Sequence, residues 1–144
     1  MAYHRPEPAE TGPRERASDM IAYSTVGVND MPRSIAFYDA VFAPLGASRE
    51  TTSDTWTGYR RAGEKAWFFL TRPFDKREAS NGNGAMLAFL APDRAAVDAF
   101  HAAALAQGGV CEGPPGVREG MNPVFYAAYV RDPDGAKLCA YVRK

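Results

Sequence analysis

The sequence predicts an α+β protein of two tandem strand–helix–strand–strand–strand (βαβββ) units, which form a curved mixed sheet around a cleft. Three observations predict this fold class. Hydrophobic spacing changes between the strand period and the helix period in the same order twice. A shift of 63 positions (86 minus 23) superimposes the two halves, with Tyr23 on Met86. A Pro133-Asp134-Gly135 turn separates the last two apolar stretches.

The first unit covers residues 20–80 and opens with a strand over residues 20–28. A helix follows, because Asn29 or Asp30 can cap it and Pro32 fits its first turn. Gly46 can end this helix. Its apolar residues recur at helical spacing: Ile35, Tyr38, Phe42 and Leu45. Three short strands are expected over 48–54, 55–61 and 65–71, and a charged, glycine-rich loop over 75–84 closes the unit.

The second unit covers residues 84–144 and repeats this order. A strand over 85–91 leads into a helix that Pro92 and Asp93 open and Gly108-Gly109 ends. The apolar face of that helix carries Val97, Phe100, Ala104 and Leu105. Strands are expected near 110–113, 124–131 and 136–142. Such a repeat predicts two half-sheets that bury together what neither buries alone, with a cleft suited to a small molecule.

Residues 1–19 are expected to form a disordered arm, and residues 20–144 a single domain. The arm carries Pro6, Pro8 and Pro13, many charges and no apolar periodicity, so it cannot offset the entropy of its own ordering. The alternative is an ordered arm that packs on a partner subunit.

Bulk composition excludes several classes of protein. Lys plus Arg and Asp plus Glu each number 17, so the net charge is zero, which argues against nucleic acid as a partner. No apolar run is long enough to cross a membrane. The two cysteines, Cys111 and Cys139, do not make a disulfide framework, and we expect a cytoplasmic protein.

Two segments carry a family resemblance. Residues 26–38 (VGVNDMPRSIAFY) are similar to a first strand that enters a helix through Asp and a Ser-x-x-Phe-Tyr run, and residues 129–135 (YVRDPDG) to an Asp-Pro-Asp-Gly turn before a last strand. Residues 20–144 thus resemble the vicinal oxygen chelate superfamily of glyoxalases, bleomycin-resistance proteins and dioxygenases. The resemblance implies the βαβββ repeat and a homodimer.

The resemblance also implies where a metal would be held. In metal-binding members, the first and last strands of each half offer His, Gln or Glu to one divalent ion. Those positions fall here on Tyr23, Phe68, Met86 and Cys139. Phenylalanine has no donor atom, a thioether is soft, and a phenol ordinarily keeps its proton at neutral pH. We therefore expect no metal and no other cofactor, and the four residues either line a ligand pocket or fill the core.

Other residues have two readings each. Arg118 could hold a ligand carboxylate or be a solvated loop arginine. Arg60 and Glu50 could be a polar handle in the cleft or an exposed cross-strand pair. Tyr129 belongs to a set of strand aromatics of which alternation sends about half toward the cleft. His101 is expected to be structural.

The function expected from these observations is metal-independent binding of a small organic molecule in an aromatic cleft. Two alternatives stay open. The chain could be a divalent-metal-dependent lyase or dioxygenase whose ligands come from unexpected positions, or a non-catalytic dimeric interaction module.

Overall fold

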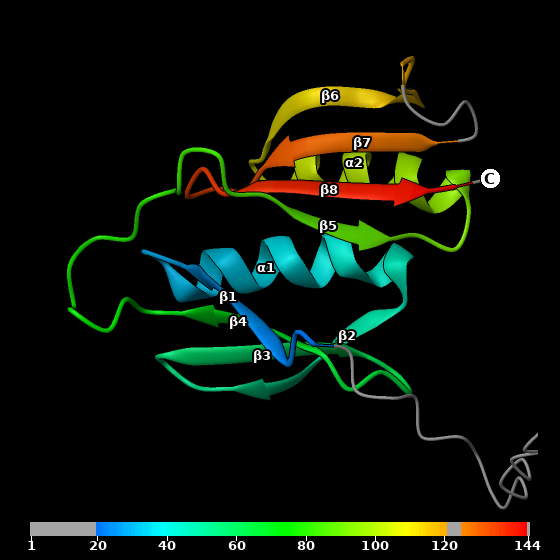
Figure 1. Ribbon diagram of the computed structural model, residues 1–144. Helices are drawn as coiled ribbons and strands as arrows, with labels where there is room; N and C mark the ends of the chain where they lie inside the picture. Colours follow the sequence, from blue (N-terminus) through cyan, green and yellow to red (C-terminus); the bar gives the residue numbers. More distant parts are fainter. Residues whose placement is uncertain (1–19, 121–124, 144) are drawn as a thin grey trace, which may run out of the picture.

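The structure is a computed structural model that describes residues 20–120 and 125–143 (Figure 1). It has two βαβββ units, as predicted, with one four-stranded mixed sheet in each. The first unit contains β1 (Tyr23–Gly27), α1 (Met31–Phe42), a short 3-10 turn η1 (Ala43–Leu45), β2 (Ala47–Thr52), β3 (Trp56–Arg61) and β4 (Trp67–Thr71). The second contains β5 (Leu87–Leu90), α2 (Arg94–Ala106), β6 (Val110–Val117), β7 (Tyr126–Arg131) and β8 (Lys137–Val142).

Local chemistry sets the helix ends where the sequence predicts them. The Asp30 carboxylate accepts a hydrogen bond from the backbone N of Arg33 at 3.1 Å, so Asp30 rather than Asn29 caps α1. Asp93 caps α2 in the same way, with 2.8 Å to the backbone N of Ala96. Gly46 adopts φ 77° and ends η1, a conformation that glycine reaches without a Cβ penalty.

The two sheets share one topology, which confirms the repeat. Their strand orders are β1-β4-β3-β2 and β5-β8-β7-β6, with the first pair parallel and the others antiparallel. The expected bounds differ most at β6, which continues to Val117 instead of ending near residue 113. Its pairing with β7 shifts register on both sides of Gly113, and these irregularities let the strand run through Pro114 and Pro115.

A single aromatic core joins the two units. In Figure 1, α2 lies behind the second sheet and α1 lies between the two sheets. The Phe42 ring of α1 packs 5.1 Å from Phe68 of β4 and 5.1 Å from Phe89 of β5. Phe68 and Phe89 are themselves 5.7 Å apart. These contacts bury apolar surface from both units at once, so neither unit is complete alone.

The turn between β7 and β8 is tied to α1 by polar groups. The buried Tyr38 hydroxyl donates to Asp132 Oδ2 at 2.6 Å, and burial raises the pKa of both groups. Asp134 accepts from Asn29 Nδ2 at 3.2 Å and from Arg33 Nη2 at 3.0 Å. The turn of the second unit therefore completes the entry to the first helix. Within the described residues, no helix has the length and hydropathy needed to cross a bilayer.

Candidate functional site

Each sheet has one face against the helices and one face turned away from them. On the first sheet, the face turned away from the helices is aromatic. We define this aromatic face as Tyr23, Trp56, Trp67 and Phe69. The Phe69 ring is its centre, at 5.7 Å from Tyr23, 5.1 Å from Trp56 and 5.4 Å from Trp67. Tyr23 is 59% and Trp56 43% exposed. The face is therefore an apolar surface open to solvent.

Gly58 makes room for the centre of the aromatic face. A Cβ at this position would lie 2.7 Å from Cε1 of Phe69, closer than real Cβ contacts. Because Gly58 pairs with Phe69 across β3 and β4, the ring occupies the space that a side chain at position 58 would take.

Arg60 adds the polar group of this face. Its guanidinium lies 4.3 Å from the ring centroid of Trp67, and Nη2 is 2.8 Å from Glu50 Oε2. Both side chains are about one third exposed, at 34% and 32%. Arg60 and Glu50 thus form a cross-strand ion pair, and the charge of the arginine is balanced on its own sheet.

The second sheet presents a cationic face, which we define as Arg118, Lys137 and Arg143 with the rings of Tyr129 and Tyr141 beneath them. Arg118 Cζ lies 5.3 Å and Lys137 Nζ 5.6 Å from the centroid of Tyr129. Arg143 Cζ lies 6.0 Å from Tyr141. The cations are thus held over aromatic rings.

The Arg118 side chain lies folded onto the sheet. Its Nη2 donates to the carbonyl of Ala127 at 3.0 Å and also to that of Pro114. Gly113 leaves space for it, because a Cβ there would lie 3.2 Å from Arg118 Nη2. Arg118 is therefore part of the face rather than a solvated loop residue.

Cys139 lies beneath these groups and is 1% exposed. Burial raises the pKa of its thiol to about 11, although Tyr129, Arg118 and Lys137 favour the thiolate. Burial also raises the pKa of Tyr129, and Cys139 contributes to that rise. Both groups keep their protons at neutral pH, so neither is an anionic ligand or a ready nucleophile.

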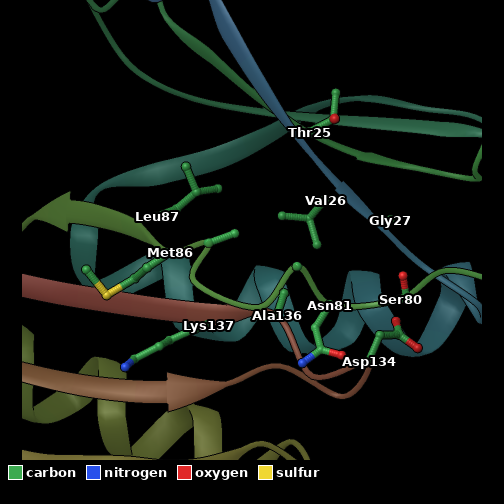
Figure 2. Close-up of a pocket in the computed structure, with 12 residues that line it drawn as sticks. Thr25, Val26, Gly27, Ser80, Asn81, Met86, Leu87, Asp134, Ala136 and Lys137 are labelled. Atoms are coloured by element: carbon green, nitrogen blue, oxygen red, sulfur yellow. The ribbon is translucent and has the colours of Figure 1, made fainter.

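A hollow of about 240 Å³ lies between β1 and β5 (Figure 2). Thr25 and Gly27 of β1 border it in the first unit, and Met86, directly before β5, and Lys137 of β8 border it in the second. A second hollow of about 510 Å³ shares Thr25 and Gly27 and continues over Trp56 on the aromatic face. The two hollows thus connect the aromatic face with the edge of the cationic face.

The structure brings some of the predicted site residues together and separates others. The first sheet carries Tyr23 and Arg60. The second carries Tyr129 and Cys139, and Arg118 directly follows its strand β6. Of the predicted site residues, only Met86 lines the hollow between the sheets. His101, expected to be structural, places Nε2 3.2 Å from Cys111 Sγ, which joins α2 to β6.

Phe68 does not join the set, because its side chain points the other way. It is 6% exposed and packs under α1, 5.0 Å from the ring of Tyr38. Thr25 pairs with Phe69 and Ala88 pairs with Cys139, and 25 plus 63 is 88. Phe69 therefore occupies in the first unit the position that Cys139 occupies in the second. Phe68 is one residue away, and a shift of one residue moves a strand side chain to the other face of the sheet.

Sequence reasoning did not select Phe69, Trp67, Trp56 or Lys137 as site residues. β4 reads Trp-Phe-Phe-Leu-Thr, a continuous apolar run that carries no alternation signal. For Lys137 the one available signal was its position: it is the first residue of β8 and comes two residues after Gly135 of the predicted turn.

Comparison with known proteins assigns a family to this geometry. The family profile described as the Glyoxalase/Bleomycin resistance protein/Dioxygenase superfamily matches residues 20–140. The chain belongs to this superfamily. No curated protein matches the chain.

Solved structures of this superfamily share the fold. A glyoxalase/bleomycin resistance protein from Albidiferax ferrireducens T118 is 42% identical, with a TM-score of 0.78 over 85% of this chain and 98% of that one. A glyoxalase-related enzyme from Fulvimarina pelagi is 21% identical, with a TM-score of 0.67 over 85% and 86%. A lactoylglutathione lyase from Agrobacterium tumefaciens is 19% identical, with a TM-score of 0.61 over 88% and 95%. The last two show the fold alone.

The residues at the superfamily's metal positions do not fit a divalent ion. With Phe69 in place of Phe68, these positions hold Tyr23, Phe69, Met86 and Cys139. They offer a phenol, a hydrocarbon ring, a thioether and one thiol, whereas such ions take three or more ligands of the imidazole, carboxylate or thiolate type. Among residues 20–120 and 125–143, no three His, Cys, Asp or Glu side chains are grouped closely enough to hold a metal.

Proposed function

We propose that this superfamily member binds a small organic molecule, without a divalent metal, in the hollows that join its aromatic and cationic faces. The observation that carries the proposal is the aromatic face, where Trp56 and Tyr23 remain exposed around the Phe69 ring. Large rings that gather on one open surface beside a hollow are typical of ligand-binding or interaction sites.

The chemistry of the lining supports binding rather than turnover. Phe69 and Trp67 offer stacking surface, and Tyr23 offers a hydroxyl as a hydrogen-bond donor. Cys139 keeps its proton, and Tyr129 also has a raised pKa. The rings and hydrogen-bond donors of the two faces suit binding, and neither Cys139 nor Tyr129 is a base ready at neutral pH.

The proposal includes a homodimer in the cytoplasm. β1 and β5 are end strands of their sheets, and large apolar side chains remain exposed beside them, including Met86 at 45% and Leu90 at 54%. Pairing of two copies would cover such edges. The free thiols of Cys111 and Cys139 suit a reducing compartment. Solution scattering at micromolar concentration tests the dimer, and a monomeric mass contradicts it.

The binding test uses the neutral fluorophore N-phenyl-1-naphthylamine as an apolar probe. We expect saturable binding, and we expect Trp56→Ala to weaken it about fivefold, since an aromatic contact is worth about 1 kcal/mol. Leu105→Ala is the matched control, because Leu105 is 45% exposed but lies on α2. Equal loss in both variants, or no binding by the wild type, contradicts the proposal. No binding together with a dimeric mass would favour an interaction module.

The metal test measures content and thermal stability. We expect no stoichiometric nickel, zinc, iron or manganese in protein purified without chelators. Adding each ion should change the melting temperature by less than about 1 °C, because an ion that bound only the native state would raise it. A rise of several degrees that Cys139→Ala or Tyr23→Phe abolishes would restore the metal-dependent lyase or dioxygenase.

A further inference from the structure

Positive charge is concentrated on one of the two sheet faces that are turned away from the helices. On the aromatic face, Arg60 is paired with Glu50 at 2.8 Å. On the cationic face, no carboxylate of the described residues forms an ion pair with Arg118, Lys137 or Arg143. The whole chain has a net charge of zero, so the excess of positive charge on the cationic face results from where the residues lie and not from the composition.

One of these cations also borders the hollow. Lys137 lines the space of about 240 Å³ between β1 and β5 (Figure 2). Its ammonium lies 5.6 Å from the Tyr129 ring. Two carboxylates lie near Lys137, and other groups bind each of them. Asp134 is engaged by Arg33 at 3.0 Å and by Asn29 at 3.2 Å. Glu112, whose pKa Lys137 helps to lower, accepts from Arg131 Nε at 2.7 Å.

The adjoining hollow has the opposite character. Its charged lining contains Asp75 and Glu78 with a single cation, Arg72. Its apolar lining includes Trp56, which belongs to the aromatic face. An anionic group would therefore be repelled from this end and attracted to the Lys137 end, while a ring could pack on Trp56 or Met86.

We propose that the ligand is a planar aromatic anion, with its acidic group held by Lys137 and supported by Arg118. This inference rests on the proposed function and names its ligand class. Lys137 supplies a charge-assisted donor at the rim of the hollow, and the field of Arg118 adds to it across Tyr129. A carboxylate, sulfonate or phosphate would satisfy the same donors.

The test compares two probes with the same ring system. 1-Anilinonaphthalene-8-sulfonate carries a sulfonate that N-phenyl-1-naphthylamine lacks. We expect the sulfonate probe to bind about tenfold tighter at low salt, since a hydrogen bond to a charged group discriminates by about that factor. We also expect its affinity, but not that of the neutral probe, to fall as salt is raised.

Variants locate the charge. Lys137→Gln should cost the sulfonate probe most of its advantage and leave the neutral probe within about twofold. Lys65→Gln, which changes an exposed lysine between β3 and β4 that borders neither hollow, should change neither affinity. Melting by circular dichroism checks that each variant is folded, and the salt series on the wild type serves if Lys137→Gln is not.

The outcomes separate this inference from the proposed function. Equal affinity for both probes overturns the anion and leaves small-molecule binding intact. The placement of the acidic group is wrong if the preference for the sulfonate probe persists in both Lys137→Gln and the Lys137→Gln/Arg118→Gln double variant. Absence of binding by either probe overturns the proposed function itself.

Discussion

Removing one hydroxyl tests the link between the two units. Tyr38→Phe deletes the donor to Asp132 Oδ2, a contact of 2.6 Å, and keeps the ring that packs on Phe42 and Phe68. Asp132 is 3% exposed, so water cannot replace the lost donor. Its other oxygen still accepts from the backbone N of Asp134 and of Ala136 at 2.9 Å.

The expected loss in the free energy of unfolding is about 1.5–3 kcal/mol, the range for a buried hydrogen bond to a charged group. For a domain of this size it corresponds to a melting temperature about 4–10 °C lower. Tyr59→Phe is the matched control. Its hydroxyl donates to Asp39 at 2.7 Å, but Asp39 is 41% exposed and water can replace the donor. We expect a loss below about 1 kcal/mol there.

The pH dependence gives a second readout. Burial raises the pKa of Asp132 from its ordinary 3.8, and the hydrogen bond from Tyr38 opposes that rise. A carboxyl whose folded pKa is raised costs stability above that pKa, and the cost disappears as the pH falls below 3.8. Tyr38→Phe raises the pKa further. The difference between variant and wild type should therefore be largest at neutral pH and shrink as Asp132 is protonated.

Urea unfolding of the three proteins at several pH values measures both effects. The reasoning is wrong if Tyr38→Phe loses no more than Tyr59→Phe at neutral pH. It is also wrong if the loss in Tyr38→Phe is the same at every pH at which the proteins fold.

Three further predictions concern the faces and the core. Gly58→Ala should displace the Phe69 ring, whose Cε1 would lie 2.7 Å from the new Cβ, and lower the free energy of unfolding by about 1–3 kcal/mol. Binding of the neutral probe should weaken as well, and unchanged binding would argue against a role for that ring. Phe89→Ala should cost about 2–3 kcal/mol by opening the contact between the units, less than for a fully buried ring because Phe89 is partly exposed; a loss below about 1 kcal/mol in urea unfolding would contradict a shared core. In Cys111→Ser, Cys139 should react with iodoacetamide far more slowly than Cys111 does in the wild type. Because its thiol pKa is about 11, its rate should rise about tenfold per pH unit above neutrality; rapid modification at pH 7, seen by intact mass, would refute the buried thiol.

Local and periodic features of the chain were predictable because they depend on neighbours in sequence. Asp30 and Asp93 cap their helices through bonds to residues three positions on, and Gly46 ends the short turn η1 that follows α1 by its own backbone conformation. The 63-residue offset predicted the repeat, because two similar units need similar patterns of burial. The sequence also shows that the residues which the resemblance places at the superfamily's metal positions include no imidazole and no carboxylate.

What remained undecided depended on pairing and on contacts between distant residues. The sequence alone did not determine whether Phe68 or Phe69 faces the helices, because a run of apolar residues fits either face and only the register of β4 with β1 chooses. The bond between Tyr38 and Asp132 spans 94 positions, and no local signal predicts it. Arg118, Lys137 and Tyr129 form one face only because β6, β7 and β8 pair side by side. Composition identifies a neutral chain, but only the tertiary structure gathers on one face three cations that form no ion pair with a carboxylate of residues 20–120 and 125–143. Charges so far apart in sequence meet only when the sheet forms.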